Sequence, residues 1–361
     1  EQVAAALSGR GHAHLVVRDF RSALDDFNGV IELQRSNPVS YYNRGILFAT
    51  AKVWDRADAD FQSATHLNPN FADAWYQRGR GWVARGRSDW AIVMFDTALE
   101  KDSNHVPSRV GKAMALRASG MVAEALATVN SALGADPAYA NAYVVRGHTL
   151  LEQGDMDGAL ADFQHAADLD PSLTDASVNR GALLGRMGRY EEAAAAYTVA
   201  LNQDPKHKAA LGGRGTAYRL LGRFDEAIDD HSQLITLQPN DPAPLLARGK
   251  DYAAAGATEQ ALADFGRAAA GNPPAVAALS ERAALLIATN RFSEAAQDFK
   301  QLAEIETNNA HHRLNHAVAL SAAGESDAAL AKFGELLVQN PNFLPARVRR
   351  GQLLAALGDL D

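Results

Sequence analysis

An arginine followed by a small residue recurs every 34 residues along this chain of 361 residues. The nine copies are Arg10-Gly11, Arg44-Gly45, Arg78-Gly79, Arg146-Gly147, Arg180-Gly181, Arg214-Gly215, Arg248-Gly249, Arg282-Ala283 and Arg350-Gly351. Lys112-Ala113 and His316-Ala317 fill the two gaps, so no insertion or deletion breaks the register. A fixed period of this length indicates one short structural unit that is copied along the chain. Because no such unit can bury its apolar face alone, each must pack against its neighbours.

Each unit carries the signals of two helices joined by a tight turn. Twelve residues after the small residue stands an alanine, at Ala23, Ala57, Ala91, Ala125, Ala159, Ala193, Ala227, Ala261, Ala295 and Ala329. Seven residues after it there is usually a residue suited to a left-handed helix end, namely Gly86, Gly120, Gly154, Gly188, Gly222, Gly256, Asn290, Gly324 or Gly358. Proline, which cannot continue a helix interior, follows the second helix at Pro69, Pro137, Pro171, Pro205, Pro239, Pro273 and Pro341. Each unit therefore reads as helix, turn, second helix.

These markers match one known family. The segment Trp75-Tyr-Gln-Arg-Gly79 is followed by Gly86, Ala91, Phe95 and Ala98, and the same pattern returns in Asn179-Arg-Gly181, Gly188-Arg-Tyr-Glu-Glu-Ala193 and Asp204-Pro205. On these residues the chain resembles the tetratricopeptide repeat (TPR) family along essentially its whole length. The resemblance implies an all-α fold, a right-handed α-solenoid, or superhelix, of antiparallel helix hairpins with 34 residues per unit.

The register divides the chain into ten whole units and one partial unit. The units start at Ala4, Pro38, Ala72, Val106, Ala140, Thr174, Lys208, Pro242, Val276 and Ala310, and an eleventh first helix occupies 344–361. A single globular core rarely grows beyond roughly 250 to 300 residues, whereas a solenoid lengthens without that limit. We therefore expect one solenoid domain over residues 1–361.

Composition narrows the class of protein. The net charge is −8, there is no cysteine, and no uninterrupted apolar stretch is long enough to span a membrane. These features describe a soluble protein without disulfides or thiol chemistry. The sequence contains no signal peptide, which favours the cytoplasm. Because it begins at Glu1 rather than methionine, we expect a fragment, and a periplasmic or membrane-associated location stays open.

The repeated arginine resembles a basic binding surface, but helix geometry places it beside the core. At about 100 degrees per residue it lies roughly 60 degrees from the buried stripe of its helix. In six units an aspartate has the same relation to the buried stripe of the second helix. Because the planar guanidinium suits partly buried ion pairs, we predict Arg10–Asp26, Arg44–Asp60, Arg146–Asp162, Arg214–Asp230, Arg248–Asp264 and Arg282–Asp298.

The opposite face of the first helices is the predicted binding surface, and in the TPR family this face forms the concave groove. Its deeper positions carry five cations, Arg80, Arg117, Arg186, Arg219 and Lys250, against one acid, Glu152. Tyr42 and Tyr76 add apolar contact area on the same face. This basic excess predicts attraction of an acidic or carboxylate-bearing peptide. The alternative is that these are ordinary solvated charges without a ligand preference.

The predicted function is a non-catalytic scaffold that binds peptide segments of partner proteins in the groove. The alternative is a TPR targeting or regulatory arm of a larger enzyme or membrane-associated machine. Nucleic-acid binding by a related helical-hairpin array is disfavoured by the acidic net charge.

Signals for chemistry are weak. His311, His312 and His316 have helical spacing that zinc could use, but no carboxylate follows at a suitable distance. We therefore expect no catalytic site, cofactor or metal. The last helix exposes leucines that no second helix covers, so the ends also allow self-association end to end.

Overall fold

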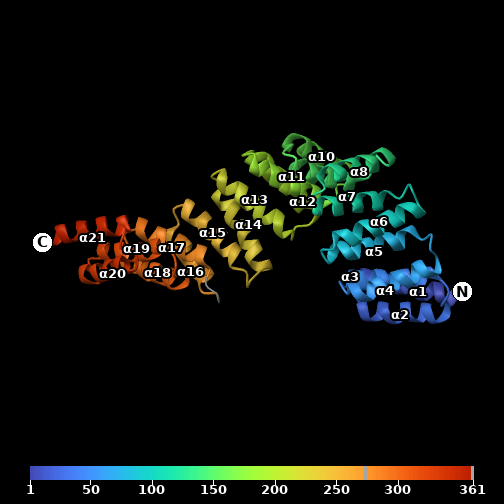
Figure 1. Ribbon diagram of the computed structural model, residues 1–361, viewed down its shortest axis with the longest axis horizontal. Helices are drawn as coiled ribbons and strands as arrows, with labels where there is room; N and C mark the ends of the chain where they lie inside the picture. The colour runs from blue at the N-terminus through green and yellow to red at the C-terminus, as the bar shows by residue number, and fades with distance from the viewer. Residues whose placement is uncertain (272–274, 359–361) are drawn as a thin grey trace. The chain divides into compact units, whose positions relative to one another are not determined.

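The computed structural model describes residues 1–271 and 275–358, and every regular element in these ranges is an α-helix. Consecutive helices form antiparallel hairpins that stack along the chain (Figure 1). The predicted all-α solenoid is therefore confirmed. Pro273 lies outside the described residues.

The chain separates into two compact units, Glu1–Ala176 and Ser177–Asp361. The first contains α1 (Gln2–Val16), α2 (Phe20–Leu33), α3 (Pro38–Thr50), α4 (Trp54–Leu67), α5 (Ala72–Ala84), α6 (Ser88–Lys101), α7 (Val106–Ala118), α8 (Val122–Ala135), α9 (Ala140–Glu152) and α10 (Met156–Leu169). Helix α11 (Thr174–Arg186) contains the boundary. The second unit continues with α12 (Tyr190–Gln203), α13 (Lys208–Leu220), α14 (Phe224–Leu237), α15 (Pro242–Ala254), α16 (Thr258–Ala269), α17 (Val276–Ala288), α18 (Phe292–Ile305), α19 (Ala310–Ala322), α20 (Ser326–Gln339) and α21 (Leu344–Leu357). The expectation of one domain over the whole chain stays a prediction.

The odd-numbered helices from α3 onward begin at the predicted unit starts. Three features of the sequence fix these boundaries. Proline stands in the first turn of α3, α7, α15 and α21, where its missing N–H leaves no bond unmade. Asn37 and Asp241 accept hydrogen bonds from backbone N–H groups at the starts of α3 and α15. Each first helix ends at the turn that carries the left-handed residue.

The core of most hairpins is an aromatic ring of the second helix packed over the small residue of the first, whereas the fourth repeat has Val129 at this position. A Cβ atom built on Gly79 would lie 2.5 Å from Cε1 of Phe95, and one on Gly147 would lie 2.7 Å from Cε1 of Phe163. Both rings are fully buried. Because glycine has no side chain, it leaves space at the helix crossing for the ring. The ring fills this space more completely than the backbone of the second helix could. Alanines such as Ala91 are also buried, but the ring makes the closest approach.

The turns between paired helices hold a residue with positive φ. All the predicted glycines and Asn290, at φ 59°, adopt this left-handed conformation, as expected for a helix end of this kind. The sequence pattern did not identify the first two turns, where Arg18 has φ 62° and Lys52 has φ 59°. Within the described residues, no helix is long and apolar enough to cross a membrane.

Candidate peptide-binding surface

The predicted arginine–aspartate pairs are present, so this arginine braces the fold. The structure pairs Arg10 with Asp26, Arg44 with Asp60, Arg146 with Asp162, Arg214 with Asp230, Arg248 with Asp264 and Arg282 with Asp298. Arg146 is typical, since Nε and Nη2 each donate to one carboxylate oxygen of Asp162 at 2.7 Å. The aspartates are buried. A bidentate guanidinium supplies the hydrogen bonds that such a buried carboxylate requires.

The remaining guanidinium nitrogen reaches the preceding repeat. Nη1 donates to a polar side chain on the second helix of that repeat, in the pairs Arg44–Asn28, Arg146–Asn130, Arg214–Thr198 and Arg248–Ser232 at 2.7, 3.1, 3.1 and 2.9 Å. Each of these arginines therefore ties together three helices of two repeats. This additional bond explains how one arginine braces both its own hairpin and the contact with the preceding hairpin.

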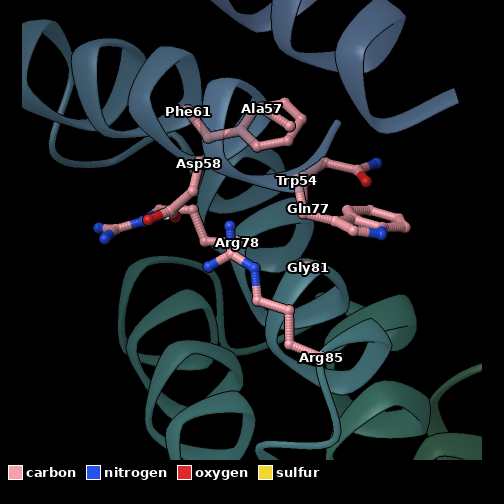
Figure 2. Close-up of a pocket in the computed structure, with 8 residues that line it drawn as sticks. All are labelled: Trp54, Ala57, Asp58, Phe61, Gln77, Arg78, Gly81 and Arg85. Carbon is pink, nitrogen blue, oxygen red and sulfur yellow. Dashed lines mark hydrogen bonds and ion pairs between the residues drawn. The ribbon is translucent and has the colours of Figure 1, made fainter. Parts of the chain in front are cut away.

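Two units without the aspartate find their partner in the preceding repeat. Nε of Arg78 donates to Asp58 at 2.9 Å, and Lys112 lies 2.6 Å from Asp96. Figure 2 shows Arg78 lining a small pocket between α4 and α5, with Trp54 on its far side. Arg85 pairs with Asp55 at 2.8 Å. These cations are therefore used by the fold.

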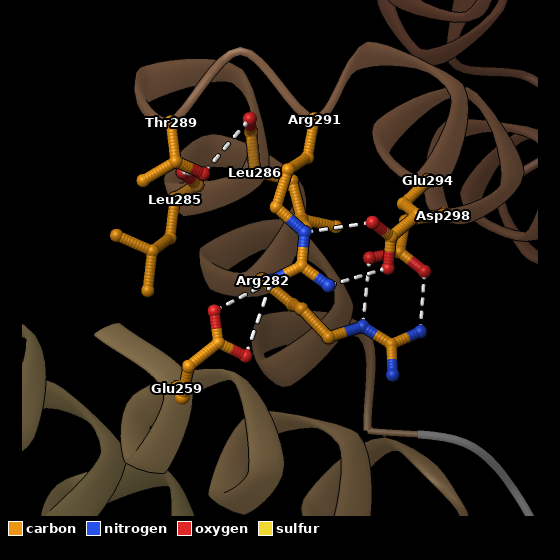
Figure 3. A network of polar contacts seen from close by, with 8 residues as sticks. All are labelled: Glu259, Arg282, Leu285, Leu286, Thr289, Arg291, Glu294 and Asp298. Carbon is orange, nitrogen blue, oxygen red and sulfur yellow. Dashed lines mark hydrogen bonds and ion pairs between the residues drawn. The ribbon is translucent and has the colours of Figure 1, made fainter. Parts of the chain in front are cut away.

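The ninth repeat adds a second ion-pair network beside the first (Figure 3). Arg282 donates from Nε and Nη2 to Asp298. Arg291 binds Glu294 through Nε at 2.7 Å and Glu259 of the preceding repeat through Nη1 at 3.0 Å. These hydrogen bonds raise the pKa of Arg291 above its usual value. The network is again structural, because each cation has a carboxylate partner.

On the opposite face of the first helices, Tyr42 and Tyr76 are half-buried. Both lie in the first compact unit, Glu1–Ala176. Tyr42 packs against Phe71 with ring centroids 4.9 Å apart, and Tyr76 packs against Phe95 at 5.8 Å and His105 at 5.5 Å. Burial raises the pKa of both tyrosines above the usual value. Both phenols therefore stay neutral at physiological pH and can donate hydrogen bonds.

Arg80 stands beside these tyrosines and is exposed. Its guanidinium carbon lies 5.9 Å from the ring centre of Tyr76, and Nη1 donates to the neutral amide of Gln77 at 3.1 Å. No carboxylate of the described residues lies within ion-pair distance of it. Tyr139 completes the group, because Tyr76 and Arg80 both affect its pKa, which burial raises. We call Tyr42, Tyr76, Arg80 and Tyr139 the tyrosine–arginine surface.

The sequence did not point to Tyr139, because it lies just before α9 rather than on a first helix. The equivalent position in other repeats holds Phe71 and His105, whose rings contact Tyr42 and Tyr76 of this surface. This recurring ring is the sequence signal that could have identified Tyr139.

Three of the other predicted cations have carboxylate partners. Arg117 in the first unit lies 2.7 Å from Glu152. In the second unit, Arg219 lies 3.2 Å from Asp251 and Lys250 lies 2.8 Å from Glu281. Glu152 is thus not the one acid near these cations. Arg186, also in the second unit, is exposed, and no ion pair is found for it among the described residues. The structure therefore brings together Tyr42, Tyr76 and Arg80, with Arg117 on the next first helix.

A buried polar pair in the seventh and eighth repeats was not predicted. His231 occupies the place of the core aromatic ring and lies against Gly215. Its Nδ1 lies 2.5 Å from an oxygen of Asp251, and both side chains are almost wholly buried. This carboxylate also faces Nε of Arg219, so its charge is balanced within the fold.

Comparison with known proteins gives the same assignment. A family model described as tetratricopeptide repeat matches residues 110–173, 178–242 and 246–310, more than half of the chain. A stretch of 77 residues is 31% identical to the heat shock protein sti1 homolog of Schizosaccharomyces pombe, covering 21% of this chain and 13% of that protein. Another of 86 residues is 27% identical to small glutamine-rich tetratricopeptide repeat-containing protein 2 of Mycosarcoma maydis, covering 24% of each. The chain thus spans a quarter or less of these relatives.

A solved structure agrees on the fold. The crystal structure of PilW, a widely conserved type IV pilus biogenesis factor, matches with a TM-score of 0.50 and 19% identity, over 58% of this chain and 97% of that chain. At this identity the likeness concerns the fold alone. With the family model, the 34-residue hairpins and the arginine–aspartate braces in place, the chain belongs to the tetratricopeptide repeat family.

Proposed function

We propose that this chain is a non-catalytic scaffold that binds an acidic or carboxylate-bearing segment of a partner protein on the tyrosine–arginine surface. Membership of a family of interaction scaffolds supports the general role. One observation supports the site: Arg80 is exposed and lies beside neutral phenols, while its guanidinium donates to the amide of Gln77 rather than to a carboxylate.

The chemistry of this surface suits a carboxylate. A guanidinium binds a carboxylate with two parallel hydrogen bonds, and tyrosine hydroxyls can donate further bonds to the same oxygens. The rings offer apolar area for the neighbouring side chains of the peptide. Arg117, Arg219 and Lys250 contribute less in this proposal, because a ligand carboxylate would have to displace Glu152, Asp251 or Glu281.

The proposal is tested with a fluorescent hexaglutamate peptide that has a free carboxyl terminus, titrated by fluorescence anisotropy at low and high salt. Arg80→Ala is expected to weaken binding by about tenfold or more, because it removes hydrogen bonds between charged groups. Binding should also weaken with salt. Arg267→Ala is the control for loss of one exposed arginine, since Arg267 lies on α16 in the second compact unit, where it is 3.6 Å from Asp264. Equal binding by the wild type and Arg80→Ala contradicts the proposed site.

A further inference from the structure

The first two turns of the chain differ from the others at the residue with positive φ. Arg18 and Lys52 adopt the left-handed conformation that glycine adopts in most of the other turns. The turns themselves are alike: N–H of Arg18 donates to Leu15 at 3.1 Å, and N–H of Gly86 donates to Val83 at 2.9 Å. Two adjacent repeats therefore keep the turn but replace its glycine by a cation.

This replacement is unfavourable for the backbone. A left-handed conformation crowds the Cβ of any residue except glycine, and asparagine, found at Asn290, is among the better tolerated exceptions. Arginine and lysine are not among these better tolerated residues, so the left-handed conformation is unfavourable at Arg18 and Lys52. Strain of this kind is a reason to look for a function of the residue that carries it.

The fold does not use these two cations. Arg18 and Lys52 are exposed, and neither has an ion pair among the described residues. The same holds for two further exposed cations near the turns, Arg21 and Arg56, although Arg56 stacks over the ring of Phe48. The four positive charges are therefore available to a partner.

The carboxylates nearest to these turns are already engaged. Asp19 caps α2 by accepting from the N–H of Ser22 at 3.2 Å and lies 3.6 Å from His14. Asp55 pairs with Arg85 at 2.8 Å. Asp19 keeps its negative charge, but the four exposed cations near the two turns outnumber it, so the turns present an excess of positive charge.

Exposed valines surround the two cations. Val16 and Val17 are 83% and 72% exposed, and Val53 is 41% exposed. Leu15, which precedes the first turn, and Phe48, which precedes the second, belong to one hydrophobic cluster. The two turns are therefore neighbours on one edge of the first unit. We call Val16, Val17, Arg18, Lys52 and Val53 the valine–cation edge.

We propose that the valine–cation edge docks on a membrane surface that carries anionic lipids. Two observations favour a membrane over an acidic peptide. Val16 ends α1, while Val17 and Val53 lie in the two turns, and all three apolar side chains are exposed. The cations Arg18 and Lys52 are direct neighbours of these apolar residues in sequence, as in segments that bury side chains at the boundary of headgroups and acyl chains while binding anionic lipids. Such docking is peripheral and needs no spanning helix.

The test uses a variant that should not harm the fold. Arg18→Gly with Lys52→Gly introduces the residue that seven of the next eight turns carry. It relieves the backbone conformation while removing two charges, so stability and membrane binding should change in opposite directions. Binding is measured by cosedimentation with phosphatidylcholine vesicles that contain about 30% phosphatidylserine or none. The wild type should bind the anionic vesicles preferentially, and the variant should bind them about 30-fold more weakly.

Two controls isolate the cause. Asn290→Gly makes the same backbone change in a turn of the second unit without removing charge. Arg347→Gln with Arg350→Gln removes two exposed charges from α21. Both should bind the anionic vesicles as the wild type does, and so should Arg80→Ala, because this proposal does not depend on the tyrosine–arginine surface.

The proposal fails if the wild type does not distinguish the two vesicles, or if the glycine variant binds them unchanged with a thermal midpoint at or above that of the wild type. If the Arg347→Gln and Arg350→Gln control loses vesicle binding to the same extent, net charge rather than the valine–cation edge causes the binding. That result would also overturn the proposal. Binding of a soluble polyglutamate peptide that the glycine variant abolishes, without vesicle binding, would assign the edge to an acidic protein instead.

Discussion

The arginine–aspartate brace makes an asymmetric prediction about stability. In the fifth repeat, Arg146 donates two hydrogen bonds to Asp162 at 2.7 Å and a third to Asn130 at 3.1 Å. Arg146→Ala leaves the buried carboxylate without these donors. Asp162→Asn leaves a guanidinium whose side chain is 28% exposed and still bonded to Asn130. The arginine substitution should therefore destabilise the protein more than the aspartate substitution.

The magnitudes follow from the burial of each group. Removing the partner of a fully buried ion costs about 3 to 5 kcal/mol. Asp162 is buried but lies beside a partly exposed side chain, so water can reach the space that Arg146→Ala opens. We therefore expect about 2 to 3 kcal/mol for this substitution and about 1 kcal/mol for Asp162→Asn. The amide of asparagine has one acceptor oxygen, so one of the two hydrogen bonds is lost, but the guanidinium that loses it is partly exposed and water can replace the acceptor.

The assay is urea denaturation followed by circular dichroism, combined with hydrogen exchange of the α9 and α10 amides, because a repeat array can open locally. The double variant completes a double-mutant cycle that isolates the pair from the separate effects of each side chain. Equal losses below about 0.5 kcal/mol for both single variants would place the pair among weak surface ion pairs and refute the brace.

Two further predictions use the same measurements. Gly79→Ala should destabilise by about 1 to 2 kcal/mol, because its Cβ would lie 2.5 Å from the ring of Phe95. Gly351→Ala, where nothing lies within 4 Å of the added Cβ, should be neutral or stabilise by up to about 1 kcal/mol, and a loss at both sites would contradict the ring-over-glycine packing. For His316, burial and the nearby Lys332 and Lys300 lower the pKa, so the unfolded chain binds the proton at a higher pH than the folded chain does. Stability should then fall as pH drops below about 6.5 towards the lowered pKa, and His316→Gln should flatten this part of the curve; an unchanged pH profile would show that His316 is not responsible.

The periodic features of the fold could be predicted from sequence. The helix starts, the left-handed turns at glycine and Asn290, and the six arginine–aspartate pairs all depend on residues at fixed places in every unit. A pair such as Arg146–Asp162 is visible in one sequence because both partners recur together. The repeat supplies several independent copies of the same contact.

Contacts that occur once could not be predicted in this way. The partners of Arg117, Arg219 and Lys250 stand at a different place in each following repeat. No periodic signal links them, and their pairing depends on how neighbouring hairpins pack.

The two kinds of arginine in this chain differ in what their guanidinium groups already bind. Arg146 and its equivalents use their donors within the fold, two on an aspartate and often a third on the preceding repeat, so a ligand carboxylate has to compete with a buried, fixed partner. Arg80 donates to an uncharged amide and lies on neutral rings, so a carboxylate can bind it without breaking an ion pair. Both are basic residues on a first helix, and the difference that matters for a ligand is what each guanidinium already binds. That distinction, rather than the number of positive charges, decides which cations of a repeat array are available for recognition.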